Sequence, residues 1–349
     1  MEIIGIKGIL PSEKVSNQQI LEIVEDRSKK EFKGDLPRTL TIIEKLLNNN
    51  GTEFRHWLTE DESPMTLIKT AFAAALKQSN IDKQDIDLLI YSSINRGFIE
   101  PANSNFIAKA LGLTCRNYDI VDACMGWVTS MDLINDKMKA GTIRYAVIIN
   151  MELGARTEGG PFARNFTLRS AAELNHKVAT FTLGEAFTAT LLSCHSPDNF
   201  KFRFNSRPDL SYLCRINLPG WRFFCDEPDV AHIESAEESY LFTSYGERMH
   251  KEGIKETTRM LSTFFSDSNN VDCIFTHTSS PKTNELILRP FGVAEKNHRV
   301  GHKTGNIATA SLPYGIADAI EQGVVSRGQD CLGCTGSAGM VFSTMAFSL

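Results

Sequence analysis

The sequence has no apolar run approaching the roughly 20 residues that cross a bilayer. Its N-terminal stretch, MEIIGIKGILPSEKV, has no basic segment ahead of an apolar one, so we expect neither a membrane span nor a signal peptide. A basic cluster is also missing, because the 37 Lys and Arg are dispersed and outnumbered by 42 Asp and Glu. The net charge of -5 argues against a partner that is nucleic acid or a membrane surface.

The sequence also lacks the cysteine spacings of a disulfide framework or of a complete metal site. The eight cysteines are scattered, which is typical of a reduced, cytoplasmic protein. Cys331 and Cys334 have the spacing of half a zinc site, but structural zinc normally takes four ligands and no second pair follows. We therefore expect two buried thiols on a strand near the C-terminus, and no metal.

What is present is an alternation of helical periodicity with short apolar runs, which indicates an α/β protein. No linker or low-complexity segment divides the chain. The first half predicts helices over 63–80, 101–112 and 124–141, and strands at LLIYSS after Asp87, at NYDIVDA and at RYAVIINME. The second half predicts helices over 236–265, up to 292 and after Asn306, and strands at CIFTHT after Asp272 and over 298–302.

These elements follow the same order twice. Cys124 lies 17 residues before Gly141, and Asn306 lies 17 residues before Gly323. The interpretation is a duplication, with halves 1–195 and 196–349 that meet at a shared core. Cys124 and Asn306 would then occupy equivalent strand-to-helix turns that face each other.

Cys124, in VDACMGWVTS, is the candidate nucleophile. A cysteine in the first turn of a helix lies at the positive end of the helix dipole, which favours the thiolate. The backbone N–H groups that follow could hold an oxyanion, and Gly126 would leave room for a thioester. Taken alone, a small buried apolar role is the commoner fate of a free cysteine.

His277 and Asn306 are candidate partners of Cys124. His277 ends the predicted strand CIFTH, where α/β proteins place side chains that face a ligand. Asn306 lies between a glycine and a helix, so it could equally cap that helix. Most histidines are polar surface or hydrogen-bonded core residues, and this is our expectation for the other seven.

Three motifs in order carry a resemblance to a known family. DACMGW resembles the nucleophile motif of β-ketoacyl-ACP synthase III, and GNIATASLPYGIADAIEQG resembles that family's asparagine motif. Gly336-Ser337-Ala338-Gly339 is similar to its glycine-rich terminal turn, and GTEFRHWLTEDESPMTLIKTAFAAAL to its early segment. The resemblance spans nearly the whole chain. It implies a thiolase fold, in which duplicated βαβαβ halves form a five-layer α-β-α-β-α sandwich, and a homodimer with the triad Cys124, His277 and Asn306.

Departures from the family pattern imply a specialised relative in secondary metabolism. The histidine opens HTSS where the family usually has His-Gln-Ala-Asn, and Gly184-Glu185-Ala186-Phe187 replaces a Gly-Asp-Gly-Ala turn. TIIEKLLNNNG lacks a clear match to the residues that hold the coenzyme A adenine, and the stretch 158–176 is longer than usual.

The resemblance also implies a mechanism. An acyl group from acyl-CoA or acyl carrier protein would load onto Cys124, with its oxyanion held by the N–H of Cys124 and one residue of the terminal turn. Decarboxylative condensation with a malonyl (or β-ketoacyl) thioester would follow, without metal or redox cofactor. The predicted oxyanion and pocket residues are Gly336, Ser337, Gly339, Trp127 and, from across the dimer, Phe98 or Ile99.

Two other functions remain open at this point. The acyl group could pass to an O, N or S acceptor with His277 as general base. The chain could also be a non-catalytic subunit of a heterodimeric synthase, although the intact triad argues against that role.

Overall fold

The computed structural model describes residues 1–154, 162–195, 199–224, 239–266 and 270–349. Its first sheet has the strand order β1-β7-β6-β4-β5, in which β4 pairs in parallel with both β5 and β6, and β7 pairs antiparallel with β6 and β1. The strands are β1 (Glu2–Ile9), β4 (Leu88–Ser92), β5 (Arg116–Ile120), β6 (Tyr145–Glu152) and β7 (Ala186–Ser193).

The second sheet repeats this topology. Its order β8-β13-β12-β11 matches β1-β7-β6-β4, with the same parallel and antiparallel pairings. We propose the boundary between the halves at 195/196, between β7 and β8. The strands are β8 (Phe200–Ser206), β11 (Cys273–Thr276), β12 (Asp330–Ser337) and β13 (Val341–Ser348).

The fifth strand of the second sheet is reduced to one bridge, so the strand predicted over 298–302 is wrong. Asn297 forms an isolated parallel bridge with Ile274, and the His298 N–H donates to the Ile274 carbonyl at 2.9 Å. The backbone then turns into the short helix α11 (Gly301–Thr304), where the N–H groups of Lys303 and Thr304 donate to the Val300 carbonyl. Local hydrogen bonds therefore replace the pairing that a longer strand would have made.

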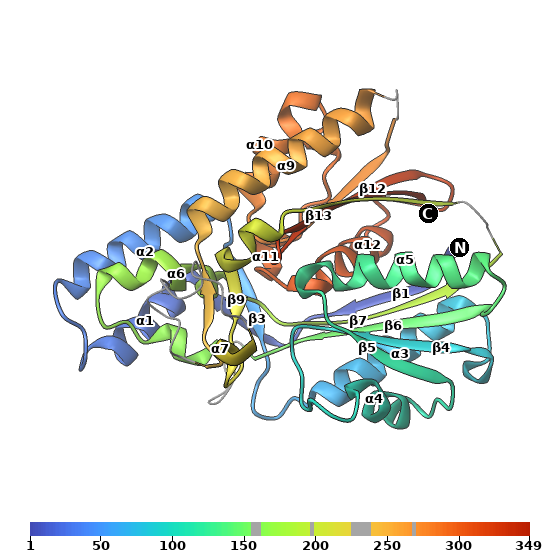
Figure 1. The fold of residues 1–349 in the computed structure, drawn as a ribbon, viewed down its shortest axis with the longest axis horizontal. Coiled ribbons are helices and arrows are strands. Elements are labelled where there is room, and N and C mark those ends of the chain that lie inside the picture. Colours follow the sequence, from blue (N-terminus) through green and yellow to red (C-terminus); the bar gives the residue numbers. More distant parts are fainter. Residues whose placement is uncertain (155–161, 196–198, 225–238, 267–269) are drawn as a thin grey trace.

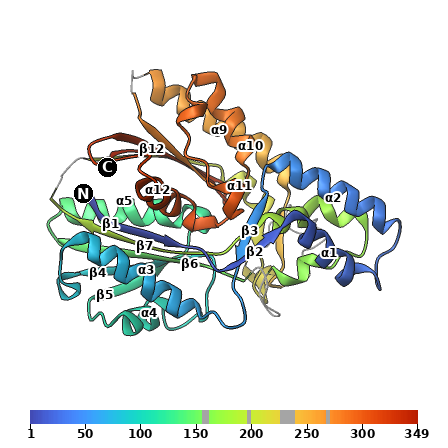
Figure 2. The same ribbon diagram turned by 180° about the vertical axis from the view of Figure 1, so that it is seen from behind.

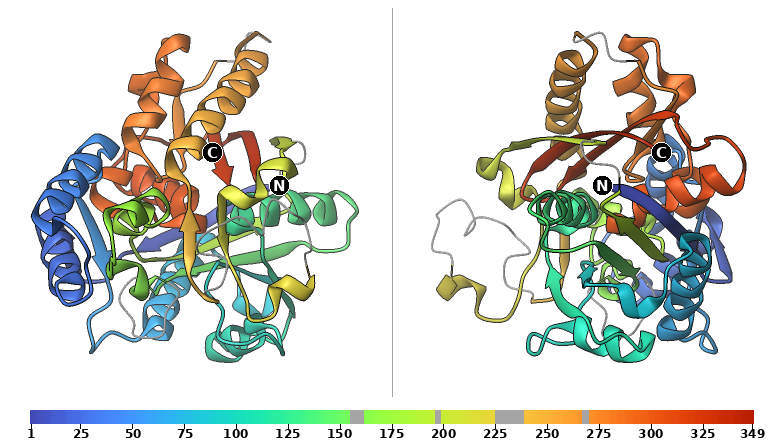
Figure 3. Two further views of the ribbon diagram at one scale, coloured as in Figure 1. Left: turned by 60° about the vertical axis from the view of Figure 1, so that its left-hand side comes forward. Right: turned by 90° about the vertical axis from the view of Figure 1, so that its right-hand side faces the viewer.

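Helices complete five layers, which confirms the predicted sandwich (Figure 1). Two helices lie between the sheets, two cover the outer face of the first sheet and two cover the outer face of the second. The right-hand view of Figure 3 shows the same layers from the end. In that order the helices are α5 (Gly126–Lys139) and α12 (Ser311–Glu321), α3 (Pro64–Ser79) and α4 (Asn103–Leu111), and α9 (Gly246–Ser266) and α10 (Pro281–Leu288).

Local signals explain where α3 begins and ends. Pro64 occupies the first turn, where its missing N–H costs no hydrogen bond, and Asn80 ends the helix in a left-handed conformation with φ 61°. The buried face packs closely on β1. A Cβ at Gly5 would lie 2.1 Å from the Ala75 carbonyl oxygen, so only glycine permits this approach.

Helix α9 begins later than predicted. The predicted helix started at residue 236, but 236–238 lie outside the described residues and Phe242–Ser244 form strand β10, which pairs with β9 (Cys214–Ile216). The strand-forming Thr243 is buried against this partner, which outweighs helical periodicity. Within the described ranges, no helix is both long and apolar enough to cross a membrane.

A smaller layer lies beside the sandwich at the end where the strands β4, β6, β11 and β12 finish (Figure 2). Its core includes Val15, Ile43, Trp57 and Phe166. The elements are β2 (Glu13–Ser16), β3 (Phe54–Trp57), α1 (Asn17–Ser28), α2 (Leu36–Asn50) and α6 (Leu174–Lys177), and α7 (Trp221–Phe224) follows β9.

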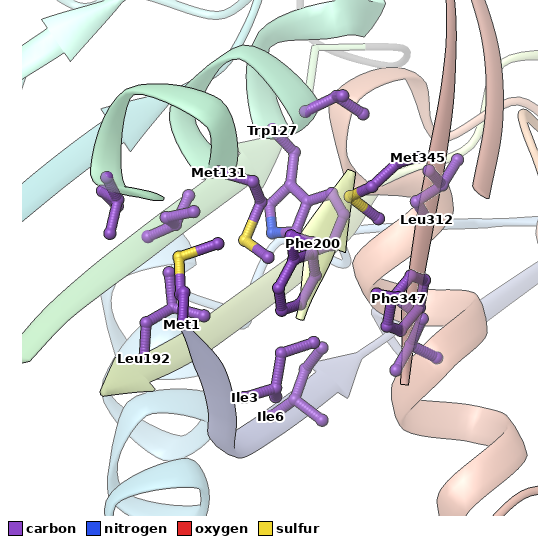
Figure 4. Close-up of a cluster of buried hydrophobic side chains, with 14 of the residues drawn as sticks. Met1, Ile3, Ile6, Trp127, Met131, Leu192, Phe200, Leu312, Met345 and Phe347 are labelled. Atoms are coloured by element: carbon purple, nitrogen blue, oxygen red, sulfur yellow. The ribbon is translucent and has the colours of Figure 1, made fainter. Parts of the chain in front are cut away.

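The core between the halves contains Trp127. Its indole packs among Met131, Phe200 and Met345 (Figure 4), and the indole N–H donates to the Thr190 hydroxyl at 3.1 Å. The side chain is fully buried and joins the two halves. The predicted place of Trp127 in a substrate pocket is therefore corrected to a structural one.

The Cys-x-x-Cys pair lies on β12, as predicted. Cys331 and Cys334 are both buried, and Cys331 lies opposite Cys273 in the parallel pairing of β12 with β11. Burial raises the pKa of both Cys331 and Cys334 to about 12. The two residues behave as buried thiols.

Candidate active site

A cavity of about 1040 Å³ lies beyond the carboxyl ends of the parallel strands of both sheets. Cys124, His277 and Asn306 all line it, although 182 positions separate Cys124 from Asn306 in the sequence. Helices α2, α9 and α10 contribute mostly apolar walls, including Leu46, Leu47, Ile254, Leu261, Ile287 and Leu288. The predicted triad is thus brought to one cavity by both halves of the fold.

Cys124 lies in the 3₁₀ turn η2 (Ala123–Met125), which leads directly into α5. The turn is held by the opposite half of the molecule. The Met125 N–H donates to the Ser337 hydroxyl at 3.2 Å, and that hydroxyl donates to the Asp122 carbonyl at 3.3 Å. Ser337 therefore fixes the position of the nucleophile's turn from the end of β12.

The electrostatics of Cys124 differ from the expected thiolate. Burial raises the pKa of the Cys124 thiol well above its usual value, and Cys214 and Glu152 shift it in the same direction. The side chain keeps some accessible surface because it faces the cavity, although it lies deep in the protein. Desolvation outweighs the helix dipole here, so the resting group is a thiol that must lose its proton to react.

Gly126 serves packing rather than substrate room. A Cβ at this position would lie 2.1 Å from the Ser92 hydroxyl oxygen, at the end of β4. The close approach lets α5 start against the first sheet, so the predicted role in leaving space for a thioester is corrected.

We expect Gly126→Ala to destabilise the protein by about 1–3 kcal/mol, because the added methyl group must displace α5 or Ser92. The displacement would also slow acyl loading on Cys124. Thermal unfolding and intact mass measure the two effects. Gly253→Ala is the matched control, since its Cβ would have only an ordinary contact of 3.9 Å with Phe342; equal stability losses in both variants would contradict the argument.

The turn equivalent to that of Cys124 in the second half is η9 (Ala308–Ala310), which leads into α12. Both turns begin with an alanine in an unusual positive conformation, Ala123 at φ 42° and Ala308 at φ 43°. This correspondence aligns Cys124 with Thr309. The predicted equivalence of Cys124 and Asn306 in the two halves is therefore off by three residues, because α5 is longer than α12.

His277 follows β11, and its two ring nitrogens have distinct environments. The Ser279 N–H donates to Nδ1 at 3.2 Å, which assigns the ring proton to Nε2. Nε2 is buried and has no hydrogen-bond partner among the described residues. Burial, with a smaller contribution from His250, lowers the pKa of His277 to about 4, so the ring is a neutral N–H donor.

Asn306 is oriented in a similar way. The Ala308 N–H donates to its side-chain oxygen at 3.0 Å, which is the capping role that the sequence left open. Its own backbone N–H donates to the Thr182 carbonyl at 2.8 Å. The amide nitrogen of Asn306 is thus left as the donor that can serve a ligand, and His277 and Asn306 together offer two donors on one cavity.

The other predicted residues divide into two groups. Gly336 and Ser337 line the cavity, whereas Gly339 does not and instead makes the β12–β13 turn with φ 124°. Phe98 and Ile99 are 47% and 81% exposed and lie outside the cavity, so their predicted contribution across a dimer stays a prediction. The long stretch 158–176 includes residues 158–161, which lie outside the described residues.

Several cavity residues with reactive side chains were not predicted from the sequence, among them Glu152, Cys214 and His250. Glu152 ends the apolar strand β6, and a carboxylate after such a strand is a signal that could have been used. His250 lies on α9, bonded through Nδ1 to the Thr283 hydroxyl at 3.0 Å, and burial lowers its pKa. Neither Cys214 nor His250 belongs to a recognisable motif, so only the fold shows that they line the cavity.

Comparison with known proteins supports the same family as the motifs. The profile of the 3-oxoacyl-[acyl-carrier-protein] synthase III C-terminal region matches residues 266–349. β-Ketoacyl-[acyl-carrier-protein] synthase III of Neisseria gonorrhoeae is 22% identical over 342 residues, covering 95% of this chain and 93% of its own. The Methylococcus capsulatus enzyme of that name is 20% identical over 337 residues, with coverages of 95% and 93%. The chain is similar to β-ketoacyl-ACP synthase III over nearly its whole length.

Solved structures show the fold independently. OleA of Xanthomonas campestris, in a variant with bound lauric acid and lauroyl-CoA, superposes with a TM-score of 0.81 at 20% identity, covering 99% of this chain and 98% of OleA. Cerulenin-bound OleA gives a TM-score of 0.80, again at 20% identity, with coverages of 99% and 96%. The thiolase fold predicted from the resemblance is confirmed, and the low identities fit a specialised relative of the proteins compared.

Proposed function

We propose that this protein is a β-ketoacyl synthase III-type acyltransferase that loads an acyl group on Cys124 and condenses it with a malonyl (or β-ketoacyl) thioester. The observation that carries this proposal is the pair of donors on the cavity. In both His277 and Asn306 the acceptor atom is already bound by a backbone N–H, so each is left with an N–H to offer. Two donors suit a carbonyl oxygen on which negative charge develops.

The first step would be attack of the Cys124 sulfur on an acyl thioester. The S–C bond forms, the donor's C–S bond breaks, and the donor thiol leaves with the proton of Cys124. Supporting oxyanion donors are the Cys124 N–H and one residue of the terminal turn, where Gly336 and Ser337 line the cavity.

The second step would be decarboxylation of the malonyl thioester. Its C–C bond to the carboxylate breaks, carbon dioxide leaves, and the electron pair forms an enolate held by the N–H groups of His277 and Asn306. The enolate carbon attacks the acyl-cysteine and the Cys124 sulfur leaves as thiolate. The chemistry is complete without metal or redox cofactor, which we include in the proposal.

The substrates would be thioesters of coenzyme A or acyl carrier protein. The curated relatives are named for the acyl carrier protein, and one OleA structure holds lauroyl-CoA. The mostly apolar cavity fits an acyl chain. Incubation of the purified protein with a panel of acyl-CoA and acyl-ACP donors, followed by intact mass, tests the proposal; a mass increase identifies the donor, and no increase with any donor would contradict it.

Transfer to an O, N or S acceptor is less well supported. That reaction needs His277 as a base, but its Nε2 carries the proton and its Nδ1 accepts the Ser279 N–H. The ring in this tautomer donates and does not accept. The geometry therefore favours condensation over the alternative.

We also propose a cytoplasmic homodimer paired through β5, the edge strand of the first sheet. Phe98 stacks on Phe106 at 4.4 Å, and both rings are exposed on the isolated chain beside this edge. The seven described cysteines are free thiols, which fits a reducing compartment.

Sedimentation should give about twice the chain mass of 38.8 kDa. Because Phe98 would be buried at the interface, Phe98→Asp should shift the equilibrium towards monomer. Phe204→Asp, at an exposed aromatic on β8, is the control and should leave the dimer intact. A monomer of the unaltered chain at micromolar concentration would contradict this proposal.

A further inference from the structure

The proposed first step needs a base that the triad does not contain. Burial keeps Cys124 as a thiol. Both ring nitrogens of His277 are committed, one to its own proton and one to the Ser279 N–H, and an asparagine amide cannot accept a proton. The proton of Cys124 must therefore go to another group on the cavity.

Glu152 is placed for this task at the end of β6. Its side chain is 4% exposed, lines the same cavity and interacts electrostatically with Cys124. One carboxyl oxygen accepts the Thr309 hydroxyl and, at 3.3 Å, the Ile94 N–H. Thr309 is the residue that corresponds to Cys124 in the second half, so the two neighbouring turns present a hydroxyl and a thiol towards this region.

We propose that Glu152 takes the proton of Cys124 during acyl loading and returns it to the departing thiol, an inference that rests on the proposed function. The S–H bond of Cys124 breaks and an O–H bond forms on the carboxylate. After the thioester exchange, that O–H bond breaks and the proton joins the donor's sulfur. One negative charge is conserved throughout, so no second charge is ever buried.

The ionisation of Glu152 suits this exchange. Burial raises the pKa of Glu152 to about 7, so a large fraction of carboxylate is available at neutral pH, and this fraction grows as the pH rises through that value. Tyr91 on β4 also interacts with Glu152, and burial raises its pKa far above this range. The other titratable or charged groups that line the cavity are Arg96, Cys214, Arg215, Tyr240, Glu247, His250, His277 and Cys334, and Asp122 lies beside Cys124.

A purely structural role for Glu152 would predict different behaviour. In a structural role, Glu152 would hold the turn η9 through its hydrogen bond with Thr309, as Ser337 holds η2 through its hydrogen bond with Met125. Loss of a structural hydrogen bond would slow acyl loading equally at every pH. A lost base would slow it only where Cys124 cannot ionise by itself.

The test is the pH dependence of Cys124 acylation, followed by intact mass in a single turnover with an accepted donor. In the unaltered protein the rate should rise through pH 7. Glu152→Gln should lose this rise and fall on the order of 10²–10⁴-fold at neutral pH, by the usual contribution of a general base. At high pH, where Cys124 forms a thiolate unaided, the variant should approach the unaltered rate.

Glu185→Gln is the matched control, because Glu185 is a buried carboxylate that accepts the N–H groups of Leu58 and Gly154, each at 2.7 Å, outside the cavity lining. It should keep the rise near pH 7. A rise that persists in Glu152→Gln, or a loss that is uniform with pH, would overturn the role of Glu152. An adduct that persists in Cys124→Ala would instead overturn the proposed function.

A donor-free measurement covers the case in which no thioester is accepted. Alkylation of Cys124 by iodoacetamide follows its thiolate, which the negative charge of Glu152 disfavours. The midpoint of the pH profile of Cys124 alkylation should therefore shift to lower pH in Glu152→Gln and stay in place in Glu185→Gln. Identical midpoints in all three proteins would overturn the coupling between Glu152 and Cys124.

Discussion

Replacement of Cys124 by alanine should abolish the acyl adduct and lower turnover by about 10⁶-fold, the loss seen when other enzymes lose their nucleophile. The expectation follows from the position of Cys124 in η2, where Ser337 holds the turn at the edge of the cavity. Without the sulfur no covalent intermediate can form. Intact mass after incubation with an accepted donor measures the first effect, and steady-state kinetics the second.

Cys214 supplies a matched control for this variant. It is a second thiol on the same cavity, and burial raises its pKa to about 11. Cys214→Ala should retain the adduct, since Cys214 lies on the strand β9 and not at the start of a helix. An adduct that survives in Cys124→Ala and disappears in Cys214→Ala would identify Cys214 on β9 as the nucleophile.

Loss of either enolate donor should slow decarboxylation of a malonyl thioester by about 10²–10³-fold, as for a lost oxyanion donor. We expect this for both Asn306→Ala and His277→Ala. Acyl loading should survive Asn306→Ala, because its amide takes no part in the proton transfer from Cys124. The measurement is carbon dioxide release from malonyl thioester in a single turnover that starts from preformed acyl-enzyme.

Asn49→Ala is the control for this series, since Asn49 lies on the cavity wall but is exposed on α2. It should leave carbon dioxide release unchanged. The condensing assignment would be excluded if the unaltered protein released no carbon dioxide from any malonyl donor and transferred its acyl group to a hydroxyl or amine. A mild effect of Asn306→Ala beside a severe effect of His277→Ala would also favour that alternative.

The sequence was most informative where local rules decide the structure. Pro64 and Asn80 mark the ends of α3 because helix termini depend on nearby residues. The apolar run at β4 was equally clear, since a strand covered on both faces needs apolar residues throughout. The motifs also located Cys124, His277 and Asn306 on what proved to be one cavity.

Tertiary contacts decided what the sequence could not. Trp127 belongs to the nucleophile motif, yet its direction on α5 buries it between the halves. The need for glycine at 126 depends on Ser92, which is distant in sequence. Glu152 and His250 reach the cavity from separate elements, and the tautomer of His277 depends on the geometry of Ser279. The thiolate expected at Cys124 was wrong for a related reason, since burial depends on the whole fold.

The bond between Met125 and Ser337 has a consequence for how the protein is made. It joins residues that are 212 positions apart, so the turn that carries Cys124 is anchored by a strand synthesised much later. The first half could form its own sheet on the ribosome, but η2 would lack this anchor until β12 had emerged and packed. A nascent chain would therefore hold a cysteine without an assembled site, and reactivity towards thioesters would arise only when the second half folds.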